Sequence, residues 1–274
     1  MESKKLMKLL EIVIIGLPNS GKSTLINAIM KNDSIFAVSN KPHTTRQVNL
    51  ASMKYEDTHM LFFDTPGLSN SSKQTVKYMS DKAKDLANKR DVCIFLFDAT
   101  KPLSSYMRIF ADSITIPKIA LLNKVDKVRE SRLLPVVDAL KEKFDHIIPI
   151  SALTHHNVDY VLNLLNTYAT RESDQEVFET NRSFIDRVKD RTYEAILHYT
   201  HNEIPYSIVI DIPDITDKDD GSKIIRQNIF VKDSHYPIIL GMIKDISIKA
   251  RTGLIGMFKT NVHYFLTVYR NKKK

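Results

Sequence analysis

The sequence predicts an α/β fold, in which a mostly parallel sheet carries helices on both faces, followed by a smaller α+β domain. The glycine-rich loop 16–23 stands between an apolar run and a helical run. Strand and helix patterns then alternate to about residue 169, which is typical of parallel sheets. A polar stretch, 169–176, separates them from a shorter series of elements. We therefore expect a first domain over 1–172, a linker over 173–183 and a second domain over 184–274.

In the first domain, apolar runs predict the strands and amphipathic runs between them predict the helices. The expected strands are 11–16, 48–55, 59–64, 92–98, 118–123 and 147–151. The expected helices lie near 22–31, 74–90, 104–114, 131–144 and 157–169. Only Glu56-Asp57-Thr58 separates the second strand from the third, which predicts a hairpin and one antiparallel edge strand.

The second domain reads as a helix, two strands, two short helices and a last strand. The helix is expected at 184–200, and the first two strands at 206–212 and 224–232, joined by the polar loop Asp214–Ser222. Two short helices are expected within 235–258 and the last strand at 262–269. The aromatic residues of the last strand alternate as in a half-buried strand, which favours core positions over base stacking.

The composition limits the kinds of partner. The chain has 274 residues, 43% of them hydrophobic, which is enough for two buried cores. Its formal charge of +8 and its pI near 9.3 suit nucleic acid or an anionic membrane, although many basic proteins bind neither. No run of about 18 apolar residues occurs, so we expect no membrane span. The single cysteine, Cys93, is expected to be a small core residue in a reducing compartment.

The loop from Gly16 to Ser23 fits the pattern G-x-x-x-x-G-K-[ST] of phosphate-binding loops. Its place between a strand and a helix makes this short pattern a credible site, because backbone N–H groups and a helix N-terminus both favour anions. We expect Lys22 to reach the β- and γ-phosphates and the Ser23 hydroxyl to ligate Mg²⁺. The predicted phosphate-binding residues are Gly16, Asn19, Ser20, Gly21, Lys22, Ser23 and Thr24.

The segment Asn123-Lys124-Val125-Asp126 favours guanine over adenine nucleotides. It follows an apolar strand and so lies at the carboxyl end, where open α/β sheets bind their ligands. The Asp126 carboxylate can accept two hydrogen bonds from guanine, whereas adenine would leave it unsatisfied. We expect Asn123 to brace the loops and the Lys124 stem to cover the base. After the next strand, Ser151, Ala152 and Leu153 offer a backbone N–H for guanine O6, for which we favour that of Ala152.

The segment Asp64, Thr65, Pro66 and Gly67 ends a strand and is expected to complete metal and phosphate recognition. Asp64 can hold Mg²⁺ through water, and the Gly67 N–H can sense the γ-phosphate. Loss of that phosphate would release the following segment, as in known order–disorder switches. Upstream, a threonine can complete the metal shell, and we favour Thr45 over Thr44. The predicted Mg²⁺ ligands are Ser23, Thr45 and Asp64.

In this order, GxxxxGKS, TTR, DTPG, NKVD and SAL resemble the translation-factor-type GTPases, and the TTR–DTPG combination resembles the Era branch. The similarity continues at 181–185, 203–207, 243–251 and 262–266. It implies a P-loop GTPase domain, a type II KH domain and hydrolysis of GTP to GDP in small ribosomal subunit assembly. The implied partners are the 3′ end of small-subunit rRNA and a pre-30S-type particle. The family's loop asparagine matches Asn19, which makes Asn19 a candidate K⁺ ligand.

A KH domain holds nucleic-acid backbone with a G-x-x-G loop between two helices. Matching 243–251 to the family leaves this loop about four residues short, with Gly241 remaining. The candidate RNA contacts are Gly241, Lys244, Lys249 and Arg251, and each of the charged ones can also be an ordinary exposed residue.

The cellular context is predicted only broadly. We expect a monomer in the cytoplasm, with peripheral contact to the inner face of the cell membrane through the basic ends of the chain. The alternative function is a GTP-dependent switch with degenerate RNA binding, which acts at a membrane surface or on a protein partner.

Overall fold

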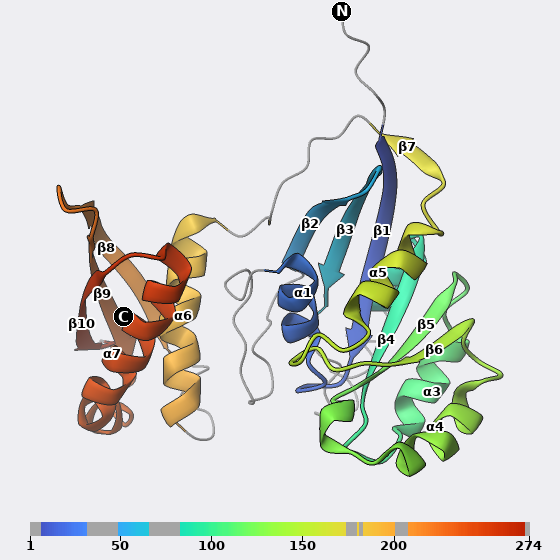
Figure 1. Ribbon diagram of the computed structural model, residues 1–274. Coiled ribbons are helices and arrows are strands. Elements are labelled where there is room, and N and C mark those ends of the chain that lie inside the picture. The colour runs from blue at the N-terminus through green and yellow to red at the C-terminus, as the bar shows by residue number, and fades with distance from the viewer. Residues whose placement is uncertain are drawn as a thin grey trace, which may run out of the picture. The chain divides into compact units, whose positions relative to one another are not determined.

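The computed structural model describes residues 7–31, 49–65, 83–173, 180, 183–200 and 208–271 (Figure 1). These residues form two compact units, one ending before residue 182 and the other continuing from it. None of the described helices is long and apolar enough to cross a membrane.

A seven-stranded sheet forms the centre of the first unit, with six strands in the order β2-β3-β1-β4-β5-β6. All neighbours on this path are parallel except β2 and β3, so the predicted parallel sheet with one antiparallel edge strand is confirmed. The bounds are β1 Met7–Gly16, β2 Asn49–Tyr55, β3 Thr58–Asp64, β4 Val92–Asp98, β5 Lys118–Asn123 and β6 His146–Pro149.

One short strand was not predicted. β7, Arg171–Ser173, pairs antiparallel with the first residues of β1, Met7 to Leu9. The polar composition of this stretch predicts a linker, but Arg171 donates to Glu11 and Asp91, and these ion pairs hold the segment on the sheet. The rest of the predicted linker lies outside the described residues, apart from Thr180 and Ser183.

The central strands β1, β3, β4 and β5 are mostly buried, as parallel strands with helices on each side require. Every residue from Val92 to Phe97 is buried, including Cys93, and burial raises the pKa of that thiol. Phe95 lies in a cluster with Phe110 and Phe144, at ring-centroid distances of 6.1 and 5.2 Å. The expectation that Cys93 is a core residue is confirmed.

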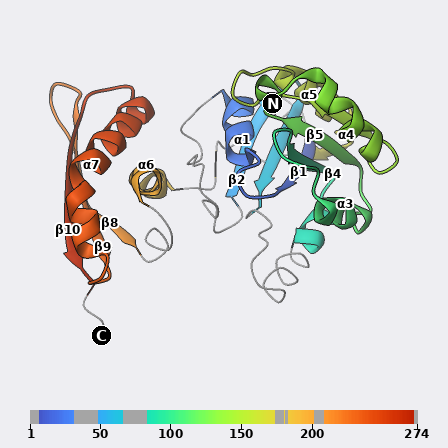
Figure 2. The same cartoon turned by 90° about the horizontal axis from the view of Figure 1, so that it is seen from below.

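Two pairs of helices cover the two faces. α3, Ser105–Asp112, and α4, Leu133–Leu140, pack on the core cluster that contains Val13 and Phe95. α1, Lys22–Met30, and α5, Val158–Asn166, contact each other on the opposite face (Figure 2). Of the helix predicted at 74–90, only 83–90 is described, and 83–87 is helical.

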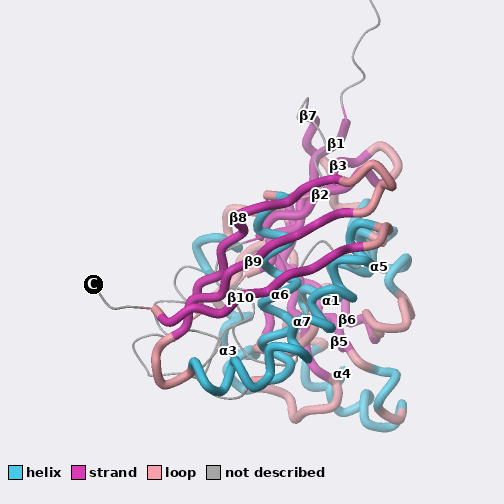
Figure 3. Tube along the Cα trace, turned by 90° about the vertical axis from the view of Figure 1, so that its left-hand side faces the viewer, coloured by secondary structure: helices cyan, strands magenta, loops and turns pink. Residues whose placement is uncertain are grey.

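The second unit contains a three-stranded sheet in the order β10-β9-β8, and Figure 3 shows its strands side by side. β9 pairs antiparallel with β8 and parallel with β10. Two helices, α6 and α7, contact each other and bury the apolar residues between themselves and the sheet. The bounds are α6 Phe184–Tyr199, β8 Val209–Asp217, β9 Lys223–Val231, α7 Tyr236–Phe258 and β10 Val262–Arg270.

The strand β8 corrects the predicted polar loop. We expected the loop to begin at Asp214, but Asp214 to Asp217 pair with β9 in the strand. The ladder shifts register between Asp211 and Asp214, and Pro213 lies in that irregularity. A bulge on an edge strand tolerates a proline, so Pro213 does not end the strand.

The helix α7 corrects a second prediction, because 236–258 forms one continuous helix and not two short ones. Ile239, Ile246, Ala250 and Leu254 are fully buried at spacings of seven and four residues, which gives one apolar side along the whole helix. Gly241 therefore lies within a helix and not in a loop.

The last strand, β10, faces two environments. Tyr264 and Val268 point into the core, as predicted for a half-buried strand. Phe265 and Tyr269 instead remain 54% and 45% exposed, so the core assignment is wrong for these two aromatic residues.

Candidate nucleotide-binding site

The loop after β1 needs both of its glycines. Asn19 and Gly21 have left-handed φ values of 66° and 100°. A Cβ on Gly21 would stand 2.4 Å from Nδ2 of Asn123, and one on Gly16 would stand 2.8 Å from the carbonyl oxygen of Leu96. The loop is thus held close to two neighbouring strand ends, where only glycine fits.

Lys22 begins α1, and its side chain reaches back into this loop. Its Nζ donates to the carbonyls of Gly16, at 3.0 Å, and Leu17, at 3.3 Å. Burial lowers the pKa of the Lys22 ammonium, and the nearby Asp64 carboxylate opposes that shift. A buried cation that donates to neutral carbonyls favours an anion in the loop, as the phosphate prediction requires.

Two oxygen groups suited to a divalent cation meet beside Lys22. The Ser23 hydroxyl donates to Oδ2 of Asp64 at 3.2 Å, and Asp64 is fully buried. Thr65 supports this strand end by donating from Oγ1 to the carbonyl of Ile14 at 2.8 Å. A hydroxyl and a carboxylate at this separation fit the mixed oxygen shell of Mg²⁺, which keeps several waters. The other predicted switch residues, Thr44, Thr45, Pro66 and Gly67, lie outside the described residues.

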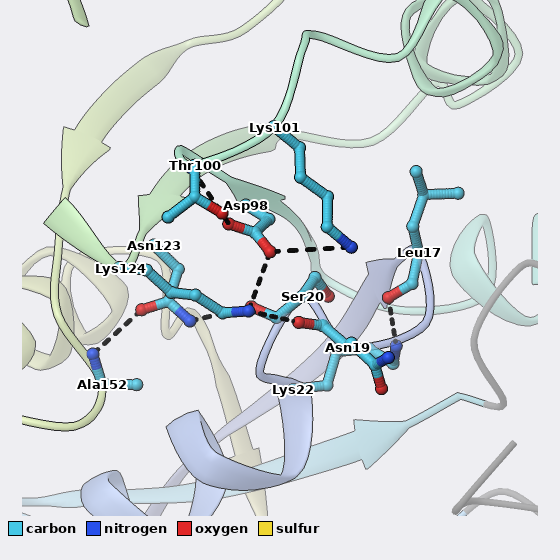
Figure 4. Close-up of polar contacts among 10 residues, drawn as sticks. All are labelled: Leu17, Asn19, Ser20, Lys22, Asp98, Thr100, Lys101, Asn123, Lys124 and Ala152. Atoms are coloured by element: carbon cyan, nitrogen blue, oxygen red, sulfur yellow. Dashed lines mark hydrogen bonds and ion pairs between the residues drawn. The ribbon is translucent and has the colours of Figure 1, made fainter. Parts of the chain in front are cut away.

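Two side chains at the carboxyl end of β5 hold the phosphate loop (Figure 4). Nδ2 of Asn123 donates to the carbonyl of Ser20 at 2.8 Å. Nζ of Lys124 donates to the carbonyl of Asn19 at 2.6 Å and to Oδ2 of Asp98 at 2.8 Å. Asn123 therefore braces the loop as predicted, and Lys124 is fixed beside it by an aspartate that the prediction did not include.

Asp126 is oriented by the segment after β6. The Ser151 hydroxyl donates to Oδ1 of Asp126 at 2.6 Å, and Ser151 in turn accepts from the N–H of Thr154 at 3.2 Å. Leu153 is 67% exposed at the same edge. The N–H of Ala152, which we expected to read guanine O6, donates to Oδ1 of Asn123 at 3.0 Å.

The aspartate that sequence reasoning missed, Asp98, ends β4 beside Asn123, its register partner at the end of β5. A signal for it exists in the sequence. Asp98 directly follows a run of apolar residues, as Asp64 and Asn123 do, and parallel strands bring their carboxyl ends to one edge.

The candidate RNA residues lie on α7 but not together. At 100° per residue, Lys244 and Arg251 share one side of the helix, whereas Lys249 lies on the other side. Arg251 donates from Nε to the carbonyl of Val262, at 2.7 Å, and from Nη2 to Asn261, at 3.1 Å. It therefore anchors the start of β10. Gly241 is exposed, with open space where a Cβ would lie.

Known proteins resemble this chain over nearly its whole length. A family model described as 50S ribosome-binding GTPase matches residues 11–124. GTPase Era of Geotalea daltonii is 33% identical over 271 residues, which cover 94% of this chain and 90% of that protein. The chain belongs to the Era family of GTPases. It is therefore a GTPase, which binds guanine nucleotides as the family does.

Other members give the same result. GTPase Era of Clostridium botulinum strain Okra is 32% identical over 272 residues, which cover 94% of this chain and 90% of the relative. A crystal structure of Era with MgGDPNP and nucleotides 1506–1542 of 16S ribosomal RNA matches with a TM-score of 0.83 at 26% identity, covering 97% of this chain and 94% of that one. An Aquifex aeolicus Era variant bound to GDP·AlF4⁻ matches with the same TM-score at 27% identity and the same coverage.

Proposed function

We propose that the edge of the sheet described above binds GTP and GDP with Mg²⁺. Two hydrogen bonds carry this proposal. Asn123 donates to the Ser20 carbonyl, and Lys124 donates to the Asn19 carbonyl. These contacts join the segment 123–126, which is predicted to bind guanine, to the phosphate loop. A single ligand that has both a guanine base and phosphates can therefore bind to both segments at once.

The residues take distinct roles in this site. Lys22 neutralises phosphate charge from within the loop, and Gly21, Ser23 and Thr24 present N–H groups at the start of α1. Ser23 and Asp64 hold Mg²⁺, which when bound offsets the charge of the phosphates. Asp126, oriented by Ser151, accepts the two guanine N–H donors. Thr45 and Gly67 complete the metal and phosphate contacts.

A monovalent cation belongs to the same proposal. Asn19 stands in the left-handed region at the tip of the loop, and its carbonyl is tied to Lys124, which leaves its side-chain oxygen as a candidate K⁺ ligand. Hydrolysis should then be faster in K⁺ than in Na⁺ at equal ionic strength, and equal rates in the two salts would remove this assignment.

Substitution of Lys22 tests the nucleotide site. Lys22→Ala should weaken GDP and GTP binding by at least about 100-fold, because it removes the buried cation that charge-assisted bonds to phosphate require. Titration with a fluorescent GDP analogue measures this loss. The matched control is Lys89→Ala, since Lys89 forms an exposed pair with Asp85. Wild-type affinity in Lys22→Ala would refute the assignment.

We further propose that the second unit binds small-subunit rRNA near its 3′ end, within a pre-30S-type particle in the cytoplasm. Support comes from the family, from the Era structure with 16S ribosomal RNA, and from the charge of +8. The exposed side of α7 offers Lys244 near Gly241 for phosphate contacts, and Lys249 offers a second cation on another side. The test is whether the full chain binds an RNA that copies this 3′ end more tightly than a scrambled RNA.

One observation favours a second candidate function. α7 is continuous through the position where a KH domain has its G-x-x-G loop, and it exposes Ile238 and Leu240 there, at 41% and 46%. Apolar side chains suit a protein or a membrane surface better than phosphate. A switch of this kind would act on a protein partner or peripherally at the cell membrane, and flotation with anionic vesicles that persists in high salt would support it.

A further inference from the structure

We propose that Asp98 is a positioning residue for nucleotide binding, which fixes the Lys124 ammonium against the phosphate loop and so couples base reading to phosphate binding. This rests on the nucleotide site proposed above and adds to it a residue from outside the recognised motifs.

The position of Asp98 follows from the sheet. It ends β4 and is the register partner of Asn123, so its side chain begins next to the segment that contains Lys124. The Asp98 side chain is only 7% exposed, and its Oδ2 accepts from Nζ of Lys124 at 2.8 Å (Figure 4). The other oxygen, Oδ1, accepts from the N–H of Thr100 at 3.0 Å and from its hydroxyl at 2.6 Å. Both carboxylate oxygens are therefore fixed in direction.

The hydrogen bonds to Asp98 favour its ionised form. Burial alone would raise its pKa, but the hydrogen bonds from Lys124 and Thr100 outweigh burial and hold the pKa below its usual value. Asp98 is therefore ionised at neutral pH, and its bond to Lys124 is the charge-assisted kind, about twice as strong as a neutral one. A second cation, Lys101, lies at 3.9 Å from Oδ2 with its side chain 57% exposed, so it contributes little.

The anchored ammonium acts on the backbone of the loop. Lys124 Nζ donates a hydrogen bond to the Asn19 carbonyl, and Asn123 Nδ2 donates one to the Ser20 carbonyl, so both carbonyls point toward these side chains. In a planar peptide unit the C=O and the next N–H point in opposite directions. The N–H of Gly21, which shares a unit with the Ser20 carbonyl, is thus turned away from Asn123. Asp98 keeps the Lys124 ammonium in place for its bond to the Asn19 carbonyl. Asn19 has a left-handed φ of 66°, which is uncommon for a residue other than glycine.

The test uses Asp98→Asn in the full chain, which keeps the size of the side chain and removes its charge. GDP affinity should fall about tenfold, the loss expected for one charge-assisted bond. In a Lys124→Ala background the same substitution should change affinity by less than about twofold, because Asp98 acts through Lys124. The matched control is Lys101→Ala, which removes the exposed neighbour and should stay within about twofold of wild type.

A milder variant keeps the proposal testable if Asp98→Asn does not fold. Thr100→Val removes one of the bonds that orient the carboxylate and should weaken GDP binding about threefold, with an unchanged unfolding temperature of the nucleotide-free protein. Wild-type affinity in Asp98→Asn, or losses that simply add in the double variant, would overturn the role of Asp98. Normal binding by Lys22→Ala would instead refute the nucleotide site itself, so the two failures are distinguishable.

Discussion

At the scale of single residues, the nucleotide site depends on side chains that orient other side chains. Asp126 shows this most simply, because its Oδ1 is held by the Ser151 hydroxyl at 2.6 Å, and Ser151 is fully buried. The bond directs the carboxylate, and guanine selectivity in the proposed site should depend on the carboxylate far more than on the hydroxyl.

Asp126→Asn should therefore change which base is bound. An amide at this position can donate to the 2-oxo group of xanthine but cannot accept both guanine donors, so affinity for GDP should fall by about 100-fold while that for XDP rises. Competition of the two diphosphates against a fluorescent nucleotide measures the change. The matched control, Ser151→Ala, should weaken GDP binding a few-fold and leave the preference for guanine intact. Unchanged selectivity in Asp126→Asn would exclude Asp126 from base reading.

The residues of this edge differ in how far the sequence reveals them. Lys22, Ser23, Asp64 and Asn123 stand in short motifs next to apolar strands, and the structure brings all four to one edge of the sheet. Asp98 has no such motif, since its role arises only when β4 and β5 pair in register. The N–H of Ala152 could not be placed from sequence either, because its bond to Asn123 depends on how two loops meet.

At the scale of elements, apolar periodicity is a good guide where an element is long and buried. The strands β4 and β5 have the predicted bounds, because continuous buried runs between polar ends leave little choice. The errors lie in both units, where exposed elements follow weaker patterns. β8 continues past Pro213 through a bulge, and β7 forms in a polar stretch through ion pairs of Arg171.

The continuity of α7 predicts the effect of substituting its glycines. Gly241 lies in the helix with no atom near the position of a Cβ, so Gly241→Ala should raise the free energy of unfolding by about 0.5–1 kcal/mol through helix propensity. Urea unfolding followed by circular dichroism measures this change. In a KH-type loop the same substitution would strain the turn and lower the stability, and that result would contradict a continuous helix.

Gly253 serves as the comparison within the same helix. Its Cβ would stand 3.2 Å from Cδ of Arg191, whose side chain is buried between α6 and α7. Gly253→Ala should gain the same propensity but force Arg191 to move, so we expect it to be less stable than Gly241→Ala.

At the scale of the whole molecule, GTP binding and RNA binding are assigned to different units and rest on different grounds. The GTP site stands on contacts among named atoms. The RNA site rests on membership of the family, on a net charge of +8 and on two lysines of α7, the exposed Lys244 and the half-buried Lys249. Arg251 is instead bonded to the start of β10. A direct measurement on the full chain therefore decides more about the second unit than any single substitution does.

The GTP-loaded protein should bind an RNA that copies the 3′ end of small-subunit rRNA more tightly than a scrambled RNA at physiological salt. Binding should weaken as salt rises, with a slope of about 0.7 per phosphate contact for single-stranded RNA. Lys244→Ala and Lys249→Ala should each weaken binding to both RNAs and reduce the slope by about 0.7, since phosphate contacts carry no sequence information. The control Lys89→Ala, in the first unit, should change neither. Equal binding of the two RNAs would mean that the second unit keeps only a basic surface, and the partner would then be sought at the exposed apolar residues Ile238 and Leu240 of α7.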